Sequence, residues 1–286
     1  MTEGGAGVEG APVPEAPLFR RRGSPLGAGG LGTDLSARGA WAMVRRNLDV
    51  FLRTWKVNFL PPLIEPVLYL LALGYGLGAL VPDIQGVPYR AFIAPAILSI
   101  TMMQSAFFET TYSSYVRMYY QKTWEAVVAT PLSHDDILVG EVLWAAIRAT
   151  INTTLMSVVV AAFGLLTFPH ALLVPVVAFA TGLLFGGIGL FATAKVPAID
   201  AFSYAMYLFI TPMFLFSGTF FPLDQLPDAA VWIAYALPLT HTVALTRGLA
   251  LGDLPDLAPW SVLYLLVGLV VFPWVAVRAA KKRVIA

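Results

Sequence analysis

Three ionisable residues lie inside apolar stretches of the sequence, where a charge is costly. Glu65, Glu109 and Arg148 each stand within a run long enough to cross a membrane. A charged side chain at the centre of a bilayer costs about 2.5 to 3.5 kcal/mol on insertion scales, so each of these residues calls for a partner or a function. We expect Arg148 to form a salt bridge with Glu65 or Glu109, and direct contact with a substrate is the alternative.

Residues 117–141 form the densest cluster of charge between the first and the last apolar run. Because this segment connects two stretches that are each long enough to span a bilayer, we expect it to face water, where a soluble partner could act on the membrane part. Thr130-Pro131 predicts the end of a short helix, and Ser133 or Asp135 could cap the next one. The alternative is a solvated loop with a helix cap. Its titratable side chains are Arg117, Lys122, Glu125, His134, Asp135, Asp136 and Glu141.

Other site chemistries find little support in the residues. His134, His170 and His241 are scattered, and no pair has metal-ligand spacing. Cys is absent, which excludes a disulfide framework, a thiolate metal site and a Cys nucleophile. The phosphate-binding pattern Gly-x-x-x-x-Gly-Lys-[Ser/Thr] does not occur, so the chain is not expected to bind ATP through a loop of this kind. We predict no metal and no cofactor in this chain.

The composition is that of a membrane protein. Of 286 residues, 58% are hydrophobic and 12% are charged, and the mean hydropathy is +0.75. That charged fraction is about half of the usual one in soluble domains. A net charge of +1 provides no global field for binding nucleic acid. The predicted class is an all-α polytopic membrane protein.

Six apolar runs reach the length of about 20 residues that a bilayer crossing requires. Residues 1–34 are predicted to be a disordered tail. Residues 35–56 show apolar residues at three- and four-residue spacing with Arg between them, which predicts an amphipathic helix in the plane of the headgroups; a helix packed on a partner is the alternative. Residues 281–286 form a basic tail. The six spans are expected at 58–80, 91–116, 142–166, 171–194, 200–218 and 258–277.

Lys and Arg predict the orientation. Fifteen of them fall on the side of the termini and of residues 117–141, whereas Arg90 and Arg247 fall on the other. By the positive-inside rule, both termini are cytoplasmic and the protein lies in the cytoplasmic (inner) membrane.

The fifth span is interrupted. Ser217-Gly218 and a Pro-containing segment follow it, and the apolar sequence resumes before Pro238. Irregular backbone at membrane depth survives only where protein or a water-filled cavity covers it. We therefore expect a broken fifth helix and an outer re-entrant element at 219–237, with a simple outer loop as the alternative.

Three segments together resemble the signature segments of ABC-2-type permeases. They are ATPLSHDDILVGE at 129–141, FLFSGTFFPLDQLP at 214–227 and ALPLTHTVALTRGLALG at 236–252. The resemblance covers about residues 35–280, and its branch contains nodulation lipo-chitooligosaccharide exporters and daunorubicin-resistance permeases. It implies a homodimer of six-span permeases bound to two copies of a separate ATPase, which holds ATP and Mg. The substrate would be an amphipath, such as a lipid-linked glycan or a lipo-oligosaccharide.

The resemblance also implies roles for residues. Residues 121–136 correspond to the family's coupling helix, which sits in a groove of the ATPase. The coupling residues would be Trp124, Glu125, Val128, Thr130, Pro131, Asp135 and Asp136.

Aromatic residues supply a predicted substrate path, because rings with one polar edge stack on sugars or drugs. A belt at the membrane interface is the alternative for those near span ends. The candidates are Tyr112, Tyr115, Tyr204, Tyr207, Phe214 and Phe216.

Three functions compete for this sequence. The first is the permease subunit of an ATP-driven exporter, with multidrug efflux as an alternative within the same family. The second is a membrane-embedded glycolipid-processing enzyme, for which Asp135-Asp136 is the only adjacent acidic pair. The third is an ion-coupled carrier built on inverted repeats, and the sequence shows no internal duplication.

Overall fold

The computed structural model describes residues 35–81, 83–84 and 86–285 of the chain. The tail predicted at 1–34 lies outside these residues. The described residues are almost entirely helical and contain no β-strand beyond an isolated bridge between Ile84 and Val87. The all-α class is confirmed.

Among the described residues, five helices are long and apolar enough to cross a membrane, or six if the bent pair of Asp228–Ala236 and Pro238–Leu251 is one span. The first contains α3 (Tyr89–Phe108) and continues through two π-helical segments, η3 (Glu109–Ser113) and η4 (Val116–Tyr120). The second is α5 (His134–Ala162), and the third is α6 (Val174–Lys195) with η5 (His170–Leu173) before it. The fourth is a composite of η6 (Ile199–Ala201), α7 (Phe202–Ala205), η7 (Met206–Ile210) and α8 (Thr211–Phe216). The fifth is α11 (Ala258–Ile285). They coincide with five of the six predicted spans.

The span predicted at 58–80 is helical but less regular. Its backbone comprises α2 (Trp55–Tyr69), the π-helical η1 (Leu70–Gly76) and a short 3-10 turn, η2 (Leu77–Ala79). The described apolar part, Leu63–Ala79, is shorter than a complete crossing. A sixth crossing at this position stays a prediction.

The first helix, α1 (Ala37–Arg53), is amphipathic, and its apolar face packs on α5. Phe51 lies edge-on to Trp144 of α5, with ring centroids 5.5 Å apart. Two glycines allow the close crossing. A Cβ at Gly39 would lie 2.4 Å from the Asp136 carboxylate, and one at Gly140 would lie 2.5 Å from Met43 Cβ. Much of the predicted lipid-facing side is therefore a protein contact, and the placement of α1 in the headgroups stays a prediction.

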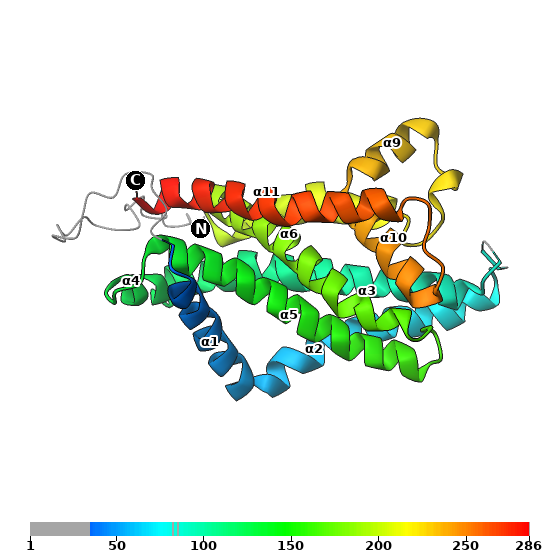
Figure 1. The fold of residues 1–286 in the computed structure, drawn as a ribbon, viewed down its shortest axis with the longest axis horizontal. Coiled ribbons are helices and arrows are strands. Elements are labelled where there is room, and N and C mark those ends of the chain that lie inside the picture. Colours follow the sequence, from blue (N-terminus) through cyan, green and yellow to red (C-terminus); the bar gives the residue numbers. More distant parts are fainter. Residues whose placement is uncertain (1–34, 82, 85, 286) are drawn as a thin grey trace, which may run out of the picture.

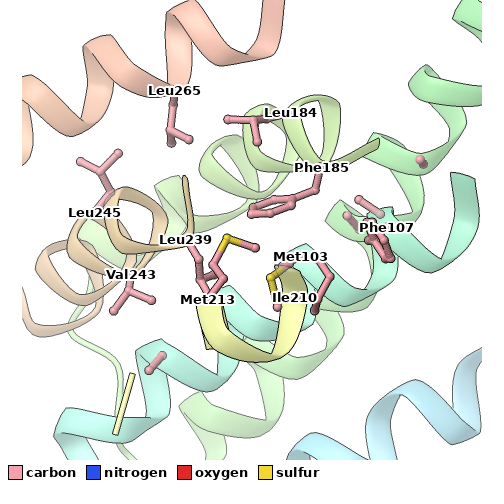
Figure 2. Close-up of a cluster of buried hydrophobic side chains, with 14 of the residues drawn as sticks. Met103, Phe107, Leu184, Phe185, Ile210, Met213, Leu239, Val243, Leu245 and Leu265 are labelled. Atoms are coloured by element: carbon pink, nitrogen blue, oxygen red, sulfur yellow. The ribbon is translucent and has the colours of Figure 1, made fainter. Parts of the chain in front are cut away.

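The core is built around α3 and α6 (Figure 2). Phe107 of α3 and Phe185 of α6 are almost fully buried, and residues of α8, α10 (Pro238–Leu251) and α11 close over them. The close helix contacts need small residues: a Cβ at Gly182 would lie 2.6 Å from Ala146 Cα, and one at Gly187 would lie 2.6 Å from the Pro273 nitrogen. The glycines of α6 thus serve packing within one chain.

The chain after α8 is broken, as expected. No helix forms between Phe216 and a short turn, η8 (Leu223–Gln225), and Gly218 has a φ of +72°. The predicted re-entrant bounds of 219–237 were too short, because α9 (Asp228–Ala236) bends by 85° into α10, which is buried in the bundle. Arg247 of α10 holds the break by donating to the Gly218 carbonyl at 2.9 Å. Arg247 also donates to the Phe92 carbonyl at 3.3 Å, near the start of α3, and its placement on the same side as Arg90 stays a prediction.

The start of α1, the end of α11 and α4 (Thr123–Val128) lie at one end of the bundle, whereas α9 projects at the other (Figure 1). Two predicted bounds are corrected here. The polar segment 117–141 is not a loop throughout, because η4 precedes α4 and α5 begins at His134 after a capping box of Ser133 and Asp136. The tail predicted at 281–286 is the last turn of α11 up to Ile285.

The α1–α5 crossing gives a test of the packing. Gly140→Ala should lower the free energy of unfolding by about 1 to 3 kcal/mol, because the new methyl group overlaps Met43. Gly76→Ala is the matched control, because the nearest atom to its Cβ is 4.0 Å away. Thermal unfolding of the detergent-purified variants measures both changes. Equal stability of the two variants would contradict this packing.

Candidate functional site

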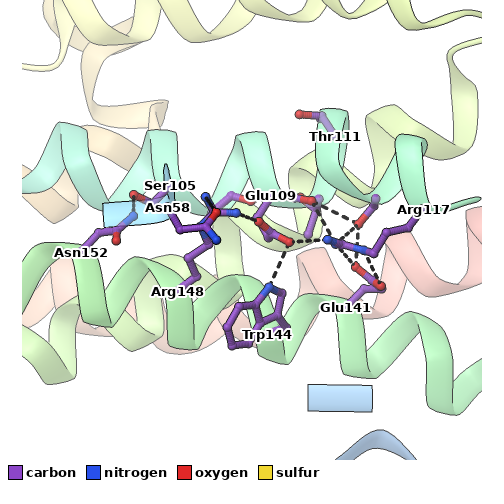
Figure 3. A network of polar contacts seen from close by, with 12 residues as sticks. Asn58, Ser105, Glu109, Thr111, Arg117, Glu141, Trp144, Arg148 and Asn152 are labelled. Atoms are coloured by element: carbon purple, nitrogen blue, oxygen red, sulfur yellow. Dashed lines mark hydrogen bonds and ion pairs between the residues drawn. The ribbon is translucent and has the colours of Figure 1, made fainter. Parts of the chain in front are cut away.

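A cluster of ionised side chains is centred on Glu109, in the π-helical continuation of α3 (Figure 3). The Glu109 side chain is buried. Its Oε1 accepts a hydrogen bond from Trp144 Nε1 at 2.9 Å and lies 2.8 Å from a guanidinium nitrogen of Arg117. Its Oε2 is bound by Arg148 of α5. The predicted salt bridge between Arg148 and Glu109 is confirmed.

Glu141 is the second buried acid of this cluster. It is 0% exposed, and it accepts hydrogen bonds from Ser114 Oγ at 2.7 Å and from Arg117 Nε at 3.1 Å. Arg117 therefore lies between two carboxylates, while Arg148 balances the second negative charge. We call Glu109, Arg117, Glu141 and Arg148 the buried ion network. Two acids and two bases make it neutral, and a buried charge is tolerated only when it is paired in this way.

The π-helical turns explain how one helix supplies both Glu109 and Arg117. Eight residues of a regular α-helix would leave these side chains about 80° apart around the axis. Turns closed by i→i+5 hydrogen bonds contain more residues for each turn. Because η3 begins with Glu109 and η4 contains Arg117, these turns bring the two side chains toward one face of the helix. Ser114 Oγ donates to the Glu109 carbonyl at 3.2 Å, which satisfies a backbone acceptor within this irregular stretch.

Sequence reasoning missed Arg117 and Glu141 as members of this site, because both were assigned to a water-facing loop. A signal was present. Glu141, Trp144 and Arg148 are spaced three and four residues apart, which places them on one face of α5. A face that carries an acid, an indole N–H and a base inside an apolar helix predicts a polar partner on the neighbouring helix.

A pocket of about 390 Å³ opens beside the buried ion network. It lies between α1, the start of α2, the π-helical segments and α5. Its lining combines charged and amide side chains with aromatic rings, and its residues include Arg46, Asn47, Phe51, Asn58, Glu109, Tyr112, Arg117, Trp144 and Arg148.

The polar groups of this pocket are only partly satisfied within the chain. Arg46 donates to Asn47 Oδ1 at 2.9 Å, and Asn47 Nδ2 is buried with no partner among the described residues. Burial lowers the pKa of Arg46 from its ordinary value, and the nearby negative charge of Glu141 opposes this change. Arg46 stays cationic because an arginine pKa is far above neutral. The pocket thus offers donors, acceptors and ring faces, which suits a hydroxylated group.

The predicted coupling residues separate into two groups. Glu125, Thr130 and Pro131 are exposed, and Val128 is half-buried. Trp124 is only 2% exposed and packs within the core at this end of the bundle. The prediction that Trp124 anchors an ATPase was therefore wrong in its physical basis, because a side chain buried in its own chain cannot fill a slot in a partner.

Asp135 and Asp136 are buried as well, which corrects their assignment to an ATPase surface. Asp136 Oδ2 accepts from the Ser133 backbone N–H at 2.9 Å, and its Oδ1 accepts from the Ser36 N–H at 2.6 Å. Asp135 lies 2.6 Å from Lys281 Nζ. The two acids therefore fasten the start of α1 and the end of α11 to the start of α5.

The predicted aromatic path does not form one lining. Tyr115 is buried and stacks on Tyr119, with centroids 4.3 Å apart. Tyr204 and Tyr207 are 69% and 73% exposed on the outer face of the bundle. Of the six candidates, Tyr112 lines the pocket described above.

Phe214 and Phe216 complete the set. Phe214 meets Phe220 edge-on at 4.9 Å, and Phe216 is 42% exposed. Glu65, the third ionisable residue expected within a span, is exposed on α2 and forms no ion pair with a described residue. No group of metal-binding side chains occurs in the described part of the chain.

Comparison with known proteins decides the family. A model of the ABC-2 type transporter family matches residues 38–251. The chain belongs to this family. It is 42% identical over 215 residues to Nodulation protein J of Rhizobium leguminosarum bv. viciae, which covers 74% of this chain and 82% of the relative. It is 39% identical over 207 residues to Nodulation protein J of Sinorhizobium fredii, covering 72% and 79%.

A more distant relative is the inner membrane transport permease YadH of Escherichia coli, which is 22% identical over 231 residues, covering 80% of this chain and 89% of the relative. The resemblance found in the three sequence segments is confirmed. The chain is an integral membrane transport subunit and not an enzyme, so the glycolipid-processing alternative falls away. ABC-2 permeases work with an ATPase subunit.

The buried ion network predicts strong coupling between its members. Glu109→Gln and Arg148→Gln should each lower the free energy of unfolding by about 3 kcal/mol, because each leaves a buried charge without its partner. The loss of unfolding free energy in the double variant should be smaller than the sum of the two single losses, by about 0.5 to 3 kcal/mol. Chemical unfolding of the native protein, the two single variants and the double variant measures this double-mutant cycle. The matched control is Glu65→Gln on an exposed residue, with an expected change within about 0.5 kcal/mol; additive effects at Glu109 and Arg148 would contradict the network.

Proposed function

We propose that the chain is the permease subunit of an ATP-driven exporter that moves an amphipathic lipo-oligosaccharide out of the cytoplasm. The observation that carries this proposal is the similarity to Nodulation protein J over most of both chains. The substrate class comes from the branch of exporters that the sequence resembles. ATP and Mg would be held by the partner ATPase, and a second copy of the chain would complete the membrane part.

Charge supports a cytoplasmic assignment for the end of the bundle that carries α4. The start of α1 and the end of α11 flank this end (Figure 1). Basic residues of these elements and of the chain just before α4 include Arg38, Lys122, Lys281, Lys282 and Arg283. Arg90 lies toward the opposite end. The positive-inside rule then favours an inner-membrane protein with both termini in the cytoplasm.

Helix α4 is the element best placed to receive a push from an ATPase. Its exposed side presents Glu125, and the following turn presents Thr130 and Pro131. Trp124 on the opposite side is buried against the core. A force on the exposed side would therefore reach the spans through packed side chains. Trp124 transmits the movement, whereas Glu125 and the turn form the contact.

The pocket beside the buried ion network supports a substrate with a hydroxylated head. Its lining includes Gln121, two residues before α4, and it combines the unsatisfied Asn47 amide with the rings of Tyr112 and Trp144. A purely apolar drug would leave these polar groups unpaired, at a cost of about 1 to 3 kcal/mol for each. The saccharide part of the substrate would enter here, and its acyl part would stay in the membrane.

Two exposed aromatic and aliphatic faces support the second copy. Tyr69 and Leu71 are exposed near the α2–η1 junction, and Tyr204, Tyr207 and Leu208 are exposed on α7 and η7. Both elements lie beside α3, and no described residue packs on their outer faces. In a homodimer these two faces would meet.

The contact role of α4 predicts a separation of two effects. Glu125→Arg should lower ATPase association and export, and it should leave the unfolding temperature of the permease unchanged because the side chain is exposed. Trp124→Ala should instead destabilise the permease by about 3 to 5 kcal/mol. Co-purification of the ATPase and thermal unfolding measure the two. Asp256→Arg, an exposed acid at the other end of the bundle, is the matched control. Full association of the Glu125→Arg variant would exclude this surface.

The substrate class is tested with the reconstituted permease–ATPase complex. Lipo-oligosaccharides should stimulate ATP hydrolysis more than hydrophobic drugs do. Asn47→Leu should reduce stimulation by lipo-oligosaccharide and leave basal hydrolysis unchanged, because it removes a donor of the pocket and keeps its volume. Equal stimulation by drugs in both proteins would favour multidrug efflux instead.

A further inference from the structure

A second cavity of the described chain, an apolar groove, lies apart from the pocket beside the buried ion network. It has a volume of about 930 Å³ and runs between α5, α6 and the second half of α11. Its walls are apolar and include Leu183, Phe191, Leu269 and Pro273. Basic side chains gather at the end where α6 and α11 finish, so the groove is amphipathic along its length.

Three of these cations have no acidic partner among the described residues. They are Lys195, the last residue of α6, and Arg278 and Lys282 of α11. Arg278 lies over the ring of Trp274 at 3.8 Å, and Trp274, Arg278 and Lys282 are four residues apart, which places them on one face of α11. We call Lys195, Arg278 and Lys282 the cationic rim.

The two other basic residues of the groove are used within the chain. Lys281 lies 2.6 Å from Asp135, the one acid in the lining. Arg283 donates to the carbonyls of Thr193 at 2.7 Å and Val196 at 2.6 Å. These contacts hold the three helix ends together and leave the charge of the cationic rim uncompensated.

Helix length places the cationic rim at the level of lipid headgroups. The 28 residues of α11 measure about 42 Å, whereas the hydrocarbon layer is about 30 Å thick. About 20 residues from Ala258 cross that layer, so Arg278 and Lys282 follow at its edge. The apolar walls at Leu269 and Pro273 then lie at the depth of acyl chains.

We propose that this groove is a binding site for an anionic phospholipid of the leaflet that faces α4, with its phosphate on the cationic rim and an acyl chain along the apolar walls. Basic pockets between membrane helices bind such headgroups. Charge complementarity selects this occupant. A second copy in a two-fold contact would bring one cationic rim against another. The N-terminal segment, residues 1–34, carries Arg20, Arg21 and Arg22, and their positive charge has the same sign as that of the cationic rim.

Trp274 provides a local reporter, because it lines the groove and is 54% exposed. The full-length protein is placed in nanodiscs that contain phosphatidylglycerol or phosphatidylcholine with the same brominated acyl chains, which quench tryptophan on contact. The fluorescence of Trp274 is obtained in each lipid as the difference in tryptophan fluorescence between the native protein and the Trp274→Phe variant. We expect stronger quenching by phosphatidylglycerol at equal mole fraction.

Removal of the cationic rim tests the assignment. In Lys195→Gln/Arg278→Gln/Lys282→Gln, the preference for phosphatidylglycerol should fall by about fivefold for each charge removed at low salt, and by less at high salt. Each variant is compared with its own Trp274→Phe partner, because Arg278 touches the reporter ring. Lys195→Arg/Arg278→Lys/Lys282→Arg keeps the charges and should keep the preference. Arg38→Gln/Arg45→Gln/Arg53→Gln on α1 removes as much charge outside the groove and should also keep it.

Two results would overturn the proposal. Equal quenching of Trp274 by the two lipids would show that the groove takes bulk lipid without selection. Absence of quenching by either lipid would show that protein covers the groove, either a second copy or the N-terminal segment. Neither result bears on export or on the ATPase contact, so the proposed function stands or falls separately.

Discussion

A carboxylate buried inside a helix bundle must keep its cationic partners, and Glu109 sets this constraint for the whole molecule. It holds Arg117 of its own helix and Arg148 of α5, and Arg117 in turn binds Glu141. Separating the two helices would leave unpaired charges in a medium of low dielectric constant. The helix made of α3, η3 and η4 and the helix α5 therefore move as one body. The α1 helix follows them, because Gly39 and Gly140 let it approach α5 closely.

The packing at this end of the bundle determines how a movement of α4 would reach the spans. Arg117 and Glu141 of the buried ion network flank the segment of chain that contains α4, and Trp124 packs α4 against buried residues of α5 and α6. The capping box at the start of α5 and the Asp135–Lys281 pair tie α1, α5 and α11 together at that end. A movement imposed on α4 would therefore be passed to α1, α5 and α11 together. Besides η3 and η4, which belong to the buried ion network, the chain is irregular at η1, at η7 and between α8 and α9.

The polar pocket and the amphipathic groove divide the surface of this end between two kinds of molecule. The pocket is lined by amides, charges and rings, which suit the proposed hydroxylated head. The groove between α6 and α11 offers cations above apolar walls, which suit the proposed anionic lipid. Both are lined in part by residues of α5. The lipid would therefore brace the elements that position the substrate pocket without entering the path of the substrate.

The sequence by itself determined the class, the five long helices, the family and the pairing of Arg148 with an acid. Length, hydropathy and local motifs carry those properties, and each is readable from consecutive residues. Only the tertiary structure decided which polar residues face water. Asp135, Asp136, Glu141 and Trp124 follow one another in a charged segment, yet all four are buried, because contacts with α1, α3 and α11 come from 24 to 146 residues away along the chain. The α5 residues that bind Glu109 and Arg117 likewise lie 24 to 39 residues away along the chain. Burial is a property of neighbours in space, and a linear pattern does not record them.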